Sequence, residues 1–553
     1  MPPAAHDSRP PLDGQHFDVV VIGGGINGVA IAREGARAGK RVLVVEQHDF
    51  ASGTTSRATR IIHGGLRYLE HGEISLVRES LRERERLVHE KAHLVRPLNF
   101  LLALPPNGQR SALELRLGLW LYRSFAGRPA GNSADADTKA LEKLLDEGEH
   151  WSVFAYEDAQ CEFPERLVAE WLTEAVQSGA VVRNHCEALA VHRRDGTVAG
   201  VQLRDALTDR EYRVECSWLI NATGPWVDTF CSRSDISLDE PMIGGVRGSH
   251  ILLPTFPEAP NAAVYTEALD GRPIFVIPWA GQVLVGTTEV KDDADPTSVQ
   301  ASAAEIDYLM RSFRRLFPTV VYGLSDIRAA FAGVRPLPFV SDRSPASITR
   351  KHLLVDHEFD AAKGMISIIG GKLTTAASLA REVARAVNLP VPEPNGFSIR
   401  TMDAAHNLIH QFEDSVRTIG GLSRESAAAV VRWFGPASVE VANLAKADES
   451  MKRALCSHTQ HIVAEAVYAA RCEFAVSLTD ILLRRVPVAF SPCWSEQCTQ
   501  TAAERIGKAL NWDSKRIGQE QETFGAEYAR FLAKPAVSVV NQVAQTPSRR
   551  GGR

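Results

Sequence analysis

The sequence has no long apolar segment. Its uninterrupted hydrophobic runs are all shorter than the roughly 18 residues that a transmembrane helix requires, so any contact with a membrane is expected to be peripheral. The first 16 residues are rich in proline and polar side chains. They lack the apolar core of a secretory signal and the arginine pattern of a transit peptide, so we expect a flexible leader over residues 1–16.

Strong net charge and paired cysteines are also missing. The chain has 62 Lys and Arg against 67 Asp and Glu, a net charge of -5, so no broad basic field suggests nucleic acid as a partner. Eight cysteines stand at scattered positions without paired spacing, which is typical of reduced thiols in a cytoplasmic protein. Hydrophobic residues make up 44% of the 553 residues, enough for about three or four domains with full cores.

The clearest feature that is present is a glycine fingerprint near the start of the chain. Residues 17–22 form an apolar, β-branched run typical of a buried parallel strand, and Gly23, Gly25 and Gly28 follow it with the spacing G-x-G-x-x-G. Gly23 permits a tight turn, Gly25 lets the backbone approach a pyrophosphate, and Gly28 allows close packing of the next helix. The start of that helix directs free N–H groups and positive partial charge at phosphates.

A second strand completes the unit. Residues 41–45 are apolar and lead into Glu46, roughly 20 residues beyond the glycines, where an acidic side chain accepts hydrogen bonds from ribose hydroxyls. A lone glycine fingerprint is as often a plain turn, but here strand, glycines, helix, strand and acid agree. The sequence therefore predicts a dinucleotide site, and at this stage NAD and FAD both remain open.

Two later strands also end in small residues. SWLINATGPWV places a strand ahead of residues 222–224, and MISIIGGKLTT places another ahead of the glycines at 370 and 371 and a helix. Small residues at a strand end let a cofactor approach the backbone closely. Beyond residue 390 a Pro-containing linker precedes a helical pattern from about residue 404 to 532, which indicates a separate helical domain.

Seven motifs in this order resemble the FAD-dependent glycerol-3-phosphate dehydrogenases, in particular bacterial aerobic members. The motifs are SRATRIIHGGLRYLEHGE, NATGPWV, GSHILLP, GTTEV, GVRPL, SITR and GGKLTT. The resemblance covers residues 17–395 and continues more weakly to LTDILLRR at 478–485. The resemblance selects FAD over NAD. Only one G-x-G-x-x-G in the chain follows a predicted strand, so a second dinucleotide site, for a nicotinamide cofactor, is not expected.

The resemblance implies an α/β, glutathione-reductase-like FAD-binding fold of the D-amino-acid-oxidase type, with a β-rich substrate domain and a C-terminal α-helical domain. It also implies oxidation of sn-glycerol 3-phosphate to dihydroxyacetone phosphate, with electrons passed through FAD to a membrane quinone. The expected location is cytoplasmic, peripheral on the cytoplasmic face of the inner membrane, and the resemblance leaves room for a homodimer.

We expect the following division of the chain: leader, 1–16; discontinuous FAD-binding domain, 17–100, 165–240 and 341–395; substrate domain, 101–164 and 241–340; helical domain, 396–535; disordered tail, 536–553. The fingerprint and the resemblance together assign FAD binding to these residues: Gly23, Gly24, Gly25, Ile26, Asn27, Gly28, Glu46, Gln47, Thr54, Thr55, Thr59, His63, Ala222, Thr223, Gly224, Gly370, Gly371, Lys372, Leu373 and Thr374.

Oxidation of a phosphorylated secondary alcohol needs cations, a proton acceptor and a stabiliser of alkoxide charge. By resemblance, the catalytic candidates are His63, His250, Arg335 and Lys372. The substrate-binding candidates are Arg67, Tyr68, Arg335 and Arg350. Guanidinium groups suit phosphate and carbonyl oxygens because they stay charged and present a planar fork.

Each of these residues also has an ordinary structural interpretation. Arg350 can form a plain salt bridge, Tyr68 can pack in the core, and Lys372 can begin a helix in solvent. His63 and His250 can both be buried structural histidines, so the general base stays open. The hydroxyls of GTTSRAT can wrap the cofactor or merely stabilise a loop.

A segment at 110–128 is a candidate for membrane contact. Leu113, Leu117, Trp120 and Leu121 share one helical side, with arginines at 110, 116, 123 and 128 around it. The opposite side holds Leu115, Leu119 and Tyr122, so a helix buried on both sides is an equal alternative.

No metal site is predicted from the spacing of histidines and cysteines. His406 and His410 share a helix face, but Asn407 occupies the position where a zinc protease needs Glu. A group drawn from Cys456, His458, His461 and Glu465 is better explained by helix packing.

Other functions compete with the dehydrogenase. A related oxidase would reduce oxygen, and an amine or amino-acid oxidase shares the fold. No long insertion separates Arg335 from Arg350, unlike the oxidase branch. A catalytically inactive flavin-binding regulatory protein is the remaining class.

Overall fold

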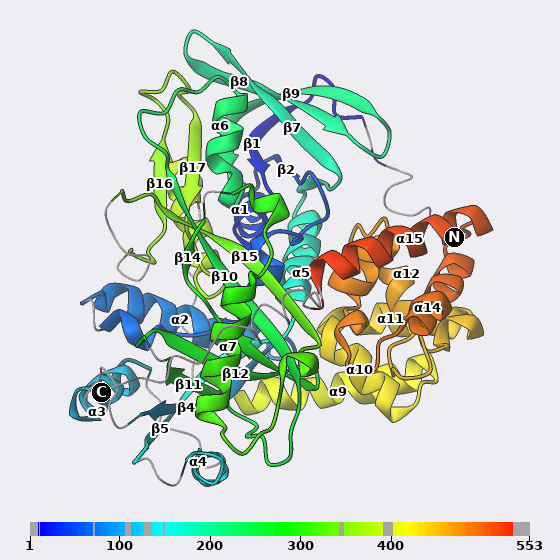
Figure 1. Cartoon of the computed structure of the whole chain (residues 1–553). Coiled ribbons are helices and arrows are strands. Elements are labelled where there is room, and N and C mark those ends of the chain that lie inside the picture. The colour runs from blue at the N-terminus through cyan, green and yellow to red at the C-terminus, as the bar shows by residue number, and fades with distance from the viewer. Residues whose placement is uncertain are drawn as a thin grey trace.

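The computed structural model describes residues 9, 11–69, 72–105, 112–126, 134–146, 150–268, 270–292, 294–341, 348–390, 402–532 and 534. Two β-sheets with their helices make up one side of the molecule, and a group of helices from the C-terminal part of the chain makes up the other (Figure 1). The predicted tail, the linker at 391–401 and part of the leader lie outside the described residues.

The first sheet is built around the strand that precedes the glycine fingerprint. Its described strands are β1 (His16–Ile22), β2 (Val42–Val45), β6 (Val181–Arg183), β7 (Cys186–Arg194), β8 (Thr197–Asp205), β9 (Arg210–Asn221), β16 (Leu353–Asp356) and β17 (Met365–Ile369). The order is β16-β17-β9-β1-β2-β6, with β17, β9, β1, β2 and β6 parallel. The parallel strands therefore end at one edge, where a ligand meets the loops that follow them.

Both faces of this sheet are covered. Val19 and Val21 of β1 enter a core shared with α1 (Ile26–Arg37), α5 (Pro164–Gln177) and α8 (Ala376–Ala386). Val20 and Ile22 point to the opposite core, under β7, β8 and α6 (Val227–Arg233). Neighbouring side chains alternate between faces in a strand, so a continuous apolar run is what a sheet buried on both sides requires.

The second sheet is larger and mixed. Its described strands are β3 (Ile61–Ile62), β4 (Val95–Leu104), β5 (Ser152–Cys161), β10 (Ile243–Pro254), β11 (Ala263–Glu267), β12 (Pro273–Trp279), β13 (Gln282–Gly286), β14 (Val290–Lys291) and β15 (Ala329–Pro338). Helices α4 (Ala134–Glu142) and α7 (Ala303–Leu316) cover one face, and α2 (Ile74–Glu90) and α3 (Ala112–Ala126) cover the other. β3 and the first part of β4 lie within residues 17–100, which were expected to belong to the FAD-binding domain. Both strands nevertheless belong to the second sheet.

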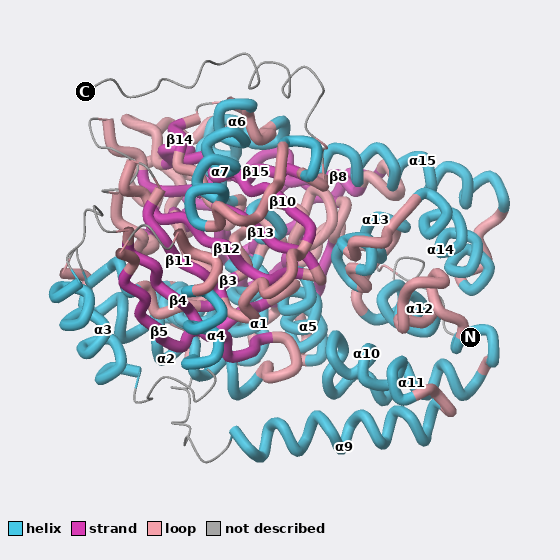
Figure 2. Tube along the Cα trace, turned by 60° about the horizontal axis from the view of Figure 1, so that its bottom comes forward, coloured by secondary structure: helices cyan, strands magenta, loops and turns pink. Residues whose placement is uncertain are grey.

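Helices dominate the C-terminal part. They are α9 (Met402–Gly420), α10 (Arg424–Phe434), α11 (Ser438–Ala447), α12 (Val463–Cys472), α13 (Leu478–Asp480), α14 (Glu496–Ala509) and α15 (Ser514–Phe531). The long helix α9 runs beside α10 and α11 (Figure 2). Their apolar core includes Trp279 and Phe331 of the second sheet, so the helical domain is packed onto the sheet and shares its core. Within the described ranges, none of the helices combines the length and apolar character needed to cross a bilayer.

A buried ion-pair network ties the helical domain to the loop that follows β2. Asp49 lies three residues after Glu46 and is 1% exposed. Arg485 donates to both of its carboxylate oxygens at 2.8 Å, and Arg484 donates to Asp49 and to Asp480. Both arginines come from the short π-helical turn Ile481–Arg485 in LTDILLRR.

Replacing Asp49 by asparagine should loosen this junction. The change leaves two buried guanidinium groups with one fewer counter-charge, and we expect the free energy of unfolding to fall by about 3 kcal/mol. Urea titration followed by tryptophan fluorescence measures the loss. Asp414→Asn is the control because its ion pair with Arg417 is exposed, and it should leave the midpoint unchanged. An unchanged midpoint in Asp49→Asn would show that the network adds no stability.

Candidate functional site

The glycine turn after β1 is so tight that side chains cannot be accommodated. A Cβ on Gly28 would lie 1.9 Å from the carbonyl oxygen of Gly23, and one on Gly23 would lie 2.5 Å from that of Ala222. Gly23 also has a φ of 105°, a conformation that glycine adopts without strain. Gly23 and Gly28 therefore need to be glycine for close backbone packing between β1, α1 and the end of β9.

The N-terminus of α1 is open for an anion. Its N-cap is Gly25, no side chain caps it, and its first turn holds no acid. The amide of Ile26 donates to Thr55 Oγ1 at 3.1 Å, and among the described residues Asn27 Oδ1 is buried without a hydrogen-bond partner. The N-terminus of α1 fits the phosphates of a dinucleotide, because the helix supplies N–H donors and positive partial charge. The Asn27 oxygen is an acceptor and would instead need an N–H or O–H donor.

Glu46 closes the other side of the turn. One carboxylate oxygen accepts from the Gly24 amide at 2.7 Å and the other from the His48 amide at 2.9 Å. Burial raises the pKa of Glu46, whereas the hydrogen bonds from these two amides act to lower it. Each oxygen can accept a second hydrogen bond, so the carboxylate can still bind ribose hydroxyls. The predicted neighbour Gln47 is half-buried beside it.

A second turn comes from the far end of the sequence. Gly370 and Gly371 have φ values of 80° and 97°. Asn27 Nδ2 donates to the carbonyl oxygen of Gly370 at 3.2 Å, and a Cβ on Gly371 would lie 2.4 Å from the same nitrogen. Leu373 packs against the core of the first sheet, and the buried Thr374 accepts from the His63 amide at 3.1 Å.

The third turn follows β9. The Ala222 amide donates to the carbonyl oxygen of Ile22 at 2.8 Å, Thr223 Oγ1 donates to Asn221 Oδ1 at 2.7 Å, and Gly224 has a φ of 63°. The ends of β1, β9 and β17 are therefore brought together, as the sequence predicted for a dinucleotide cradle.

The three threonines of GTTSRAT have three different partners. Thr54 Oγ1 donates to the carbonyl oxygen of Val334 at 2.9 Å. This bond joins the segment after β2 to β15. Thr55 accepts from the α1 amide described above. Thr59 Oγ1 lies 3.1 Å from His250 Nε2, so it touches the substrate-domain histidine.

Arg335 projects from β15 beside the GTTEV segment. Its guanidinium donates to Thr287 Oγ1 at 2.9 Å and to the carbonyl oxygen of Thr288 at 3.2 Å. Burial lowers its pKa to about 10, although Glu289 acts in the opposite direction. The group stays cationic near neutral pH and keeps N–H donors for a further oxygen.

Arg350 and Arg67 carry unsatisfied donors. Arg350 Nη2 pairs with Glu289 Oε1 at 2.6 Å, which is the alternative that the sequence left open for this residue. In the part of the chain that the structure describes, Arg350 Nη1 and Arg67 Nε are nevertheless buried without a hydrogen-bond partner. Buried guanidinium donors of this kind are expensive unless a ligand satisfies them.

Lys372 and Tyr68 lie against each other. Lys372 Nζ is 4.3 Å from the centre of the Tyr68 ring and donates to Ser80 Oγ at 3.0 Å. Burial lowers the pKa of Lys372 to about 7 and raises that of Tyr68 to about 12. The solvent-exposed alternative for Lys372 is thereby excluded.

Burial favours the neutral form of both histidines. Burial and the charge of Lys372 lower the pKa of His63 to about 3, and burial and the charge of Arg335 lower that of His250 to about 3. His63 is half-buried, with its ring 6.1 Å from that of Tyr68. His250 stacks on Phe331, and its Nδ1 is a buried atom without a partner within the described ranges.

The cations and histidines share one electrostatic environment. Arg350 influences the pKa values of Tyr68, Arg335 and Lys372. The site thus combines neutral proton acceptors, cations and unsatisfied N–H donors, which can bind an anionic, oxygen-rich substrate and remove a hydroxyl proton. Four further residues contact the predicted site residues, and no sequence pattern gave any of them a role: Ser80, Thr287, Thr288 and Glu289. The last three belong to the GTTEV motif.

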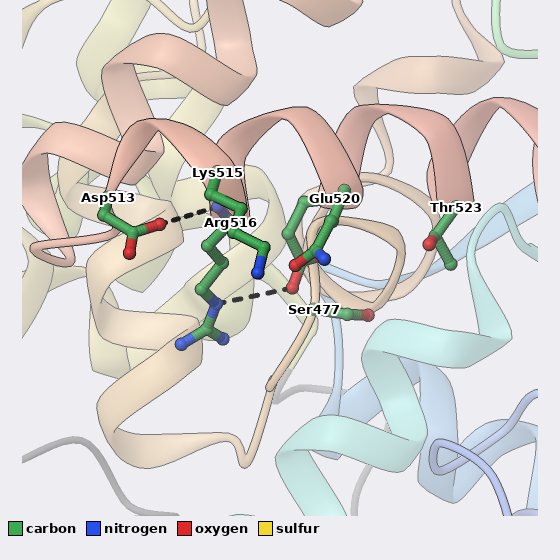
Figure 3. A pocket seen from close by; sticks show the side chains of 7 residues that line it. Ser477, Asp513, Lys515, Arg516, Glu520 and Thr523 are labelled. Carbon is green, nitrogen blue, oxygen red and sulfur yellow. Dashed lines mark hydrogen bonds and ion pairs between the residues drawn. The ribbon is translucent and has the colours of Figure 1, made fainter.

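A separate surface groove is lined by other residues. It has a volume of about 370 Å³ and lies between α15 and the loop before α13. Its charged groups bind one another, because Asp513 accepts from the Arg516 amide at 2.7 Å and Arg516 Nε lies 3.6 Å from Glu520 (Figure 3). It contains none of the predicted site residues, so it is not the active site.

The cradle and the two-sheet fold define the class of FAD-dependent oxidoreductases. The model of the FAD dependent oxidoreductase family matches residues 18–385, and that of the C-terminal domain of alpha-glycerophosphate oxidase matches residues 365–517. Within this class, the chain belongs to the FAD-dependent glycerol-3-phosphate dehydrogenase family, and its cofactor is FAD. The predicted family, fold and cofactor are confirmed.

Named relatives support this assignment, and a solved structure supports the fold. Glycerol-3-phosphate dehydrogenase from Synechocystis sp. is 35% identical over 87% of this chain and 90% of its own length. Aerobic glycerol-3-phosphate dehydrogenase from Bacillus subtilis is 28% identical over 92% of this chain and 93% of its own. The structure of glycerol-3-phosphate dehydrogenase from Bacillus halodurans complexed with FAD has a TM-score of 0.75 at 22% identity, covering 95% of this chain and 97% of that one.

Proposed function

We propose that the protein oxidises sn-glycerol 3-phosphate to dihydroxyacetone phosphate and passes the electrons to a membrane quinone. The main supporting observation is the group of buried cations with unsatisfied donors, Arg350 Nη1 and Arg67 Nε. A phosphate dianion supplies the acceptor oxygens and the negative charge that these groups lack. The names of the relatives point to the same substrate.

Arg67 and Arg350 are proposed to hold the phosphate, and Tyr68 to line the same pocket. Arg335 is proposed to bind the oxygen on the carbon that becomes the carbonyl, because its side chain is held by Thr287 and Thr288. Fixed donors of this kind stabilise negative charge on oxygen as it develops.

His250 is the proposed proton acceptor. If Nε2 donates to Thr59, Nδ1 carries a lone pair, and this buried atom has no partner within the described residues. A substrate hydroxyl would satisfy it and lose its proton there. Bound FAD supplies the hydride-accepting centre when present. His63 is proposed to border that centre, since its amide is fixed by Thr374 beside the Gly370 turn.

Lys372 is proposed to act as a cation, which makes activity sensitive to pH. Its pKa of about 7 means that it is charged below neutrality and loses its proton as the pH rises through 7. We expect kcat/KM, which reports the free enzyme, to fall along an alkaline limb near this pH. In Lys372→Arg the group stays charged, so the limb should disappear from a pH profile measured with glycerol 3-phosphate. A limb that persists unchanged would assign it to another group.

Anaerobic reduction tests the proposed substrate. Glycerol 3-phosphate should bleach the flavin absorbance of the holoenzyme, whereas glycine and D-amino acids should leave it oxidised. Absence of bleaching by glycerol 3-phosphate would overturn the substrate assignment. Turnover with a soluble quinone analogue against peroxide formation in air then separates the dehydrogenase from an oxidase, and FAD binding with neither activity identifies an inactive regulator.

Helix α3 supports the membrane part of the proposal. Leu117 and Trp120 are 65% and 64% exposed, and Arg116 and Arg123 are exposed around them. Leu115, Leu119 and Tyr122 fill the core beneath, so the buried side of this helix is the one opposite Leu117 and Trp120. Arg110, Arg128 and the side chain of Leu113 lie outside the described residues. Exposed Leu and Trp flanked by arginines suit the lipid–water interface.

A double substitution, Leu117→Glu and Trp120→Glu, should weaken binding to anionic liposomes by at least about tenfold, because it replaces the inserting surface with charge. Co-sedimentation measures the change. Leu207→Glu is the matched control, since Leu207 is an exposed leucine on another part of the surface. Equal loss in both variants would show that α3 is not the docking surface. Homodimerisation, cytoplasmic location and the exact domain limits stay predictions.

A further inference from the structure

Three soft metal ligands converge in the helical domain, away from the FAD cradle. They are Cys456, His458 and Cys498, and their ligand atoms all lie within 4.8 Å of one another. His458 Nδ1 is 3.4 Å from Cys498 Sγ. Sequence analysis combined Cys456 and His458 with other residues, because Cys498 is 40 positions beyond His458 in the chain.

The alternative partners are occupied elsewhere. His461 Nδ1 lies 2.8 Å from Glu465 Oε1, and its ring stacks on Trp433 at 3.5 Å. Glu465 also accepts from the Ile462 amide at 2.5 Å. These contacts fix His461 and Glu465 at the start of α12. The side chains of Cys456 and His458, in the loop before the helix, take no part in them.

Backbone contacts position the three ligands independently of any metal. The loop carrying Cys456 and His458 is closed by the Leu455 amide, which donates to the carbonyl oxygen of His461 at 2.8 Å. Cys498 lies in the first turn of α14, where its amide donates to the N-cap Ser495 at 3.3 Å. Arg505 of α14 donates to the carbonyl oxygen of Ala454 and joins the two segments. Figure 2 shows α12 and α14 within the same helical domain.

We propose that Cys456, His458 and Cys498 bind a zinc ion that links this loop to α14. Two thiolates and an imidazole are preferred ligands of Zn²⁺. With Zn–S near 2.3 Å and Zn–N near 2.0–2.1 Å, the ligand atoms of a tetrahedral site lie roughly 3.5–4 Å apart. The observed separations need only a small adjustment. Cys456 and Cys498 are buried and His458 is exposed, so the fourth position faces solvent.

The other such group in the described residues is not a comparable site. Asp49, His185 and Asp480 also lie within 4.8 Å of one another. Their carboxylates already bind two cations, Arg484 and Arg485. The contacts of Cys498 Sγ in the described residues are of a different kind, because it lies 3.4 Å from His458 Nδ1 and accepts from the uncharged Ser495 Oγ at 3.4 Å.

Metal content and thiol protection test the site in the FAD-loaded full chain. We expect about one Zn²⁺ per chain by elemental analysis after expression with zinc. After chelator treatment, added Zn²⁺ should slow alkylation of Cys456 and Cys498 by at least about tenfold, since a bound thiolate is protected. Cys472 is exposed and outside the group, and its alkylation rate in the same sample should not change.

Variants provide the second measurement. Cys498→Ser and His458→Ala should lose the metal while retaining FAD absorbance, and Cys472→Ser should retain both. A wild-type protein with neither bound zinc nor zinc-dependent protection would overturn the proposal. A Cys456–Cys498 disulfide that forms in the presence of zinc would also overturn it. Because FAD loading and flavin reduction are measured separately, failure here leaves the proposed oxidation of glycerol 3-phosphate untouched.

Discussion

Replacing Arg335 by glutamine is expected to lower kcat for glycerol 3-phosphate by about 100- to 1,000-fold, the loss that follows removal of a fixed donor to a developing oxyanion. The guanidinium of Arg335 is held by Thr287 and Thr288, so it is oriented before substrate binds. Glutamine offers a single neutral NH2 group in place of the guanidinium fork and cannot balance negative charge. Single-turnover flavin reduction under anaerobic conditions measures the effect on the chemical step itself.

Arg328→Gln is the matched control for this experiment. Arg328 is a half-buried arginine just before β15. Its Nη1 donates to Gln282 Oε1 at 3.1 Å. Its loss should leave flavin reduction near the wild-type rate. Arg335→Lys should fall between the two, because lysine keeps the charge but not the planar fork. If Arg335→Gln reduced its flavin as fast as Arg328→Gln, the role assigned to Arg335 would be wrong.

Replacing Gly28 by alanine should leave the protein with less than about a tenth of its FAD, because a methyl group there requires the backbone turn to open. The new Cβ would lie 1.9 Å from the carbonyl oxygen of Gly23, and backbone atoms cannot move aside as a flexible side chain can. Displacing α1 would move the amides that face the phosphates. Flavin absorbance per chain after purification measures the loss.

Gly518→Ala tests whether any glycine substitution has this effect. Gly518 lies in α15, and a Cβ there would meet nothing within 4 Å. Alanine should be accepted, with normal FAD content and a stability gain of up to about 1 kcal/mol from helix propensity. Normal FAD content in Gly28→Ala would mean that the turn relaxes without losing the cofactor.

The cofactor cradle was predictable because its signals are local. An apolar run, three glycines at fixed spacing and Glu46 all lie within one βαβ unit, and each has a conformational or hydrogen-bonding requirement that few other residues meet. The motifs around His63, Arg335 and Lys372 extended the prediction from a dinucleotide site to a protein family. In the structure, these segments do meet at the ends of β1, β9 and β17.

Side-chain partners were not predictable in the same way. The sequence left Arg350 between a salt bridge and a substrate ligand, and the structure shows a pair with Glu289 together with an unsatisfied Nη1. Thr54, Thr55 and Thr59 looked alike, yet they bind β15, the α1 amide and His250. These contacts join segments that are far apart in the chain, and no spacing or periodicity encodes them.

The sequence by itself determined a dinucleotide-binding βαβ unit, because strand and helix periods and glycine requirements are properties of short segments. The family motifs then selected the fold and FAD. Only the tertiary structure decided that α3 buries Leu115 and Leu119 and exposes Leu117 and Trp120, since both sides of that helix are apolar. It also decided that Cys498 joins Cys456 and His458. Packing between distant segments selects one of several locally acceptable arrangements, and that selection depends on shape and burial across the whole molecule.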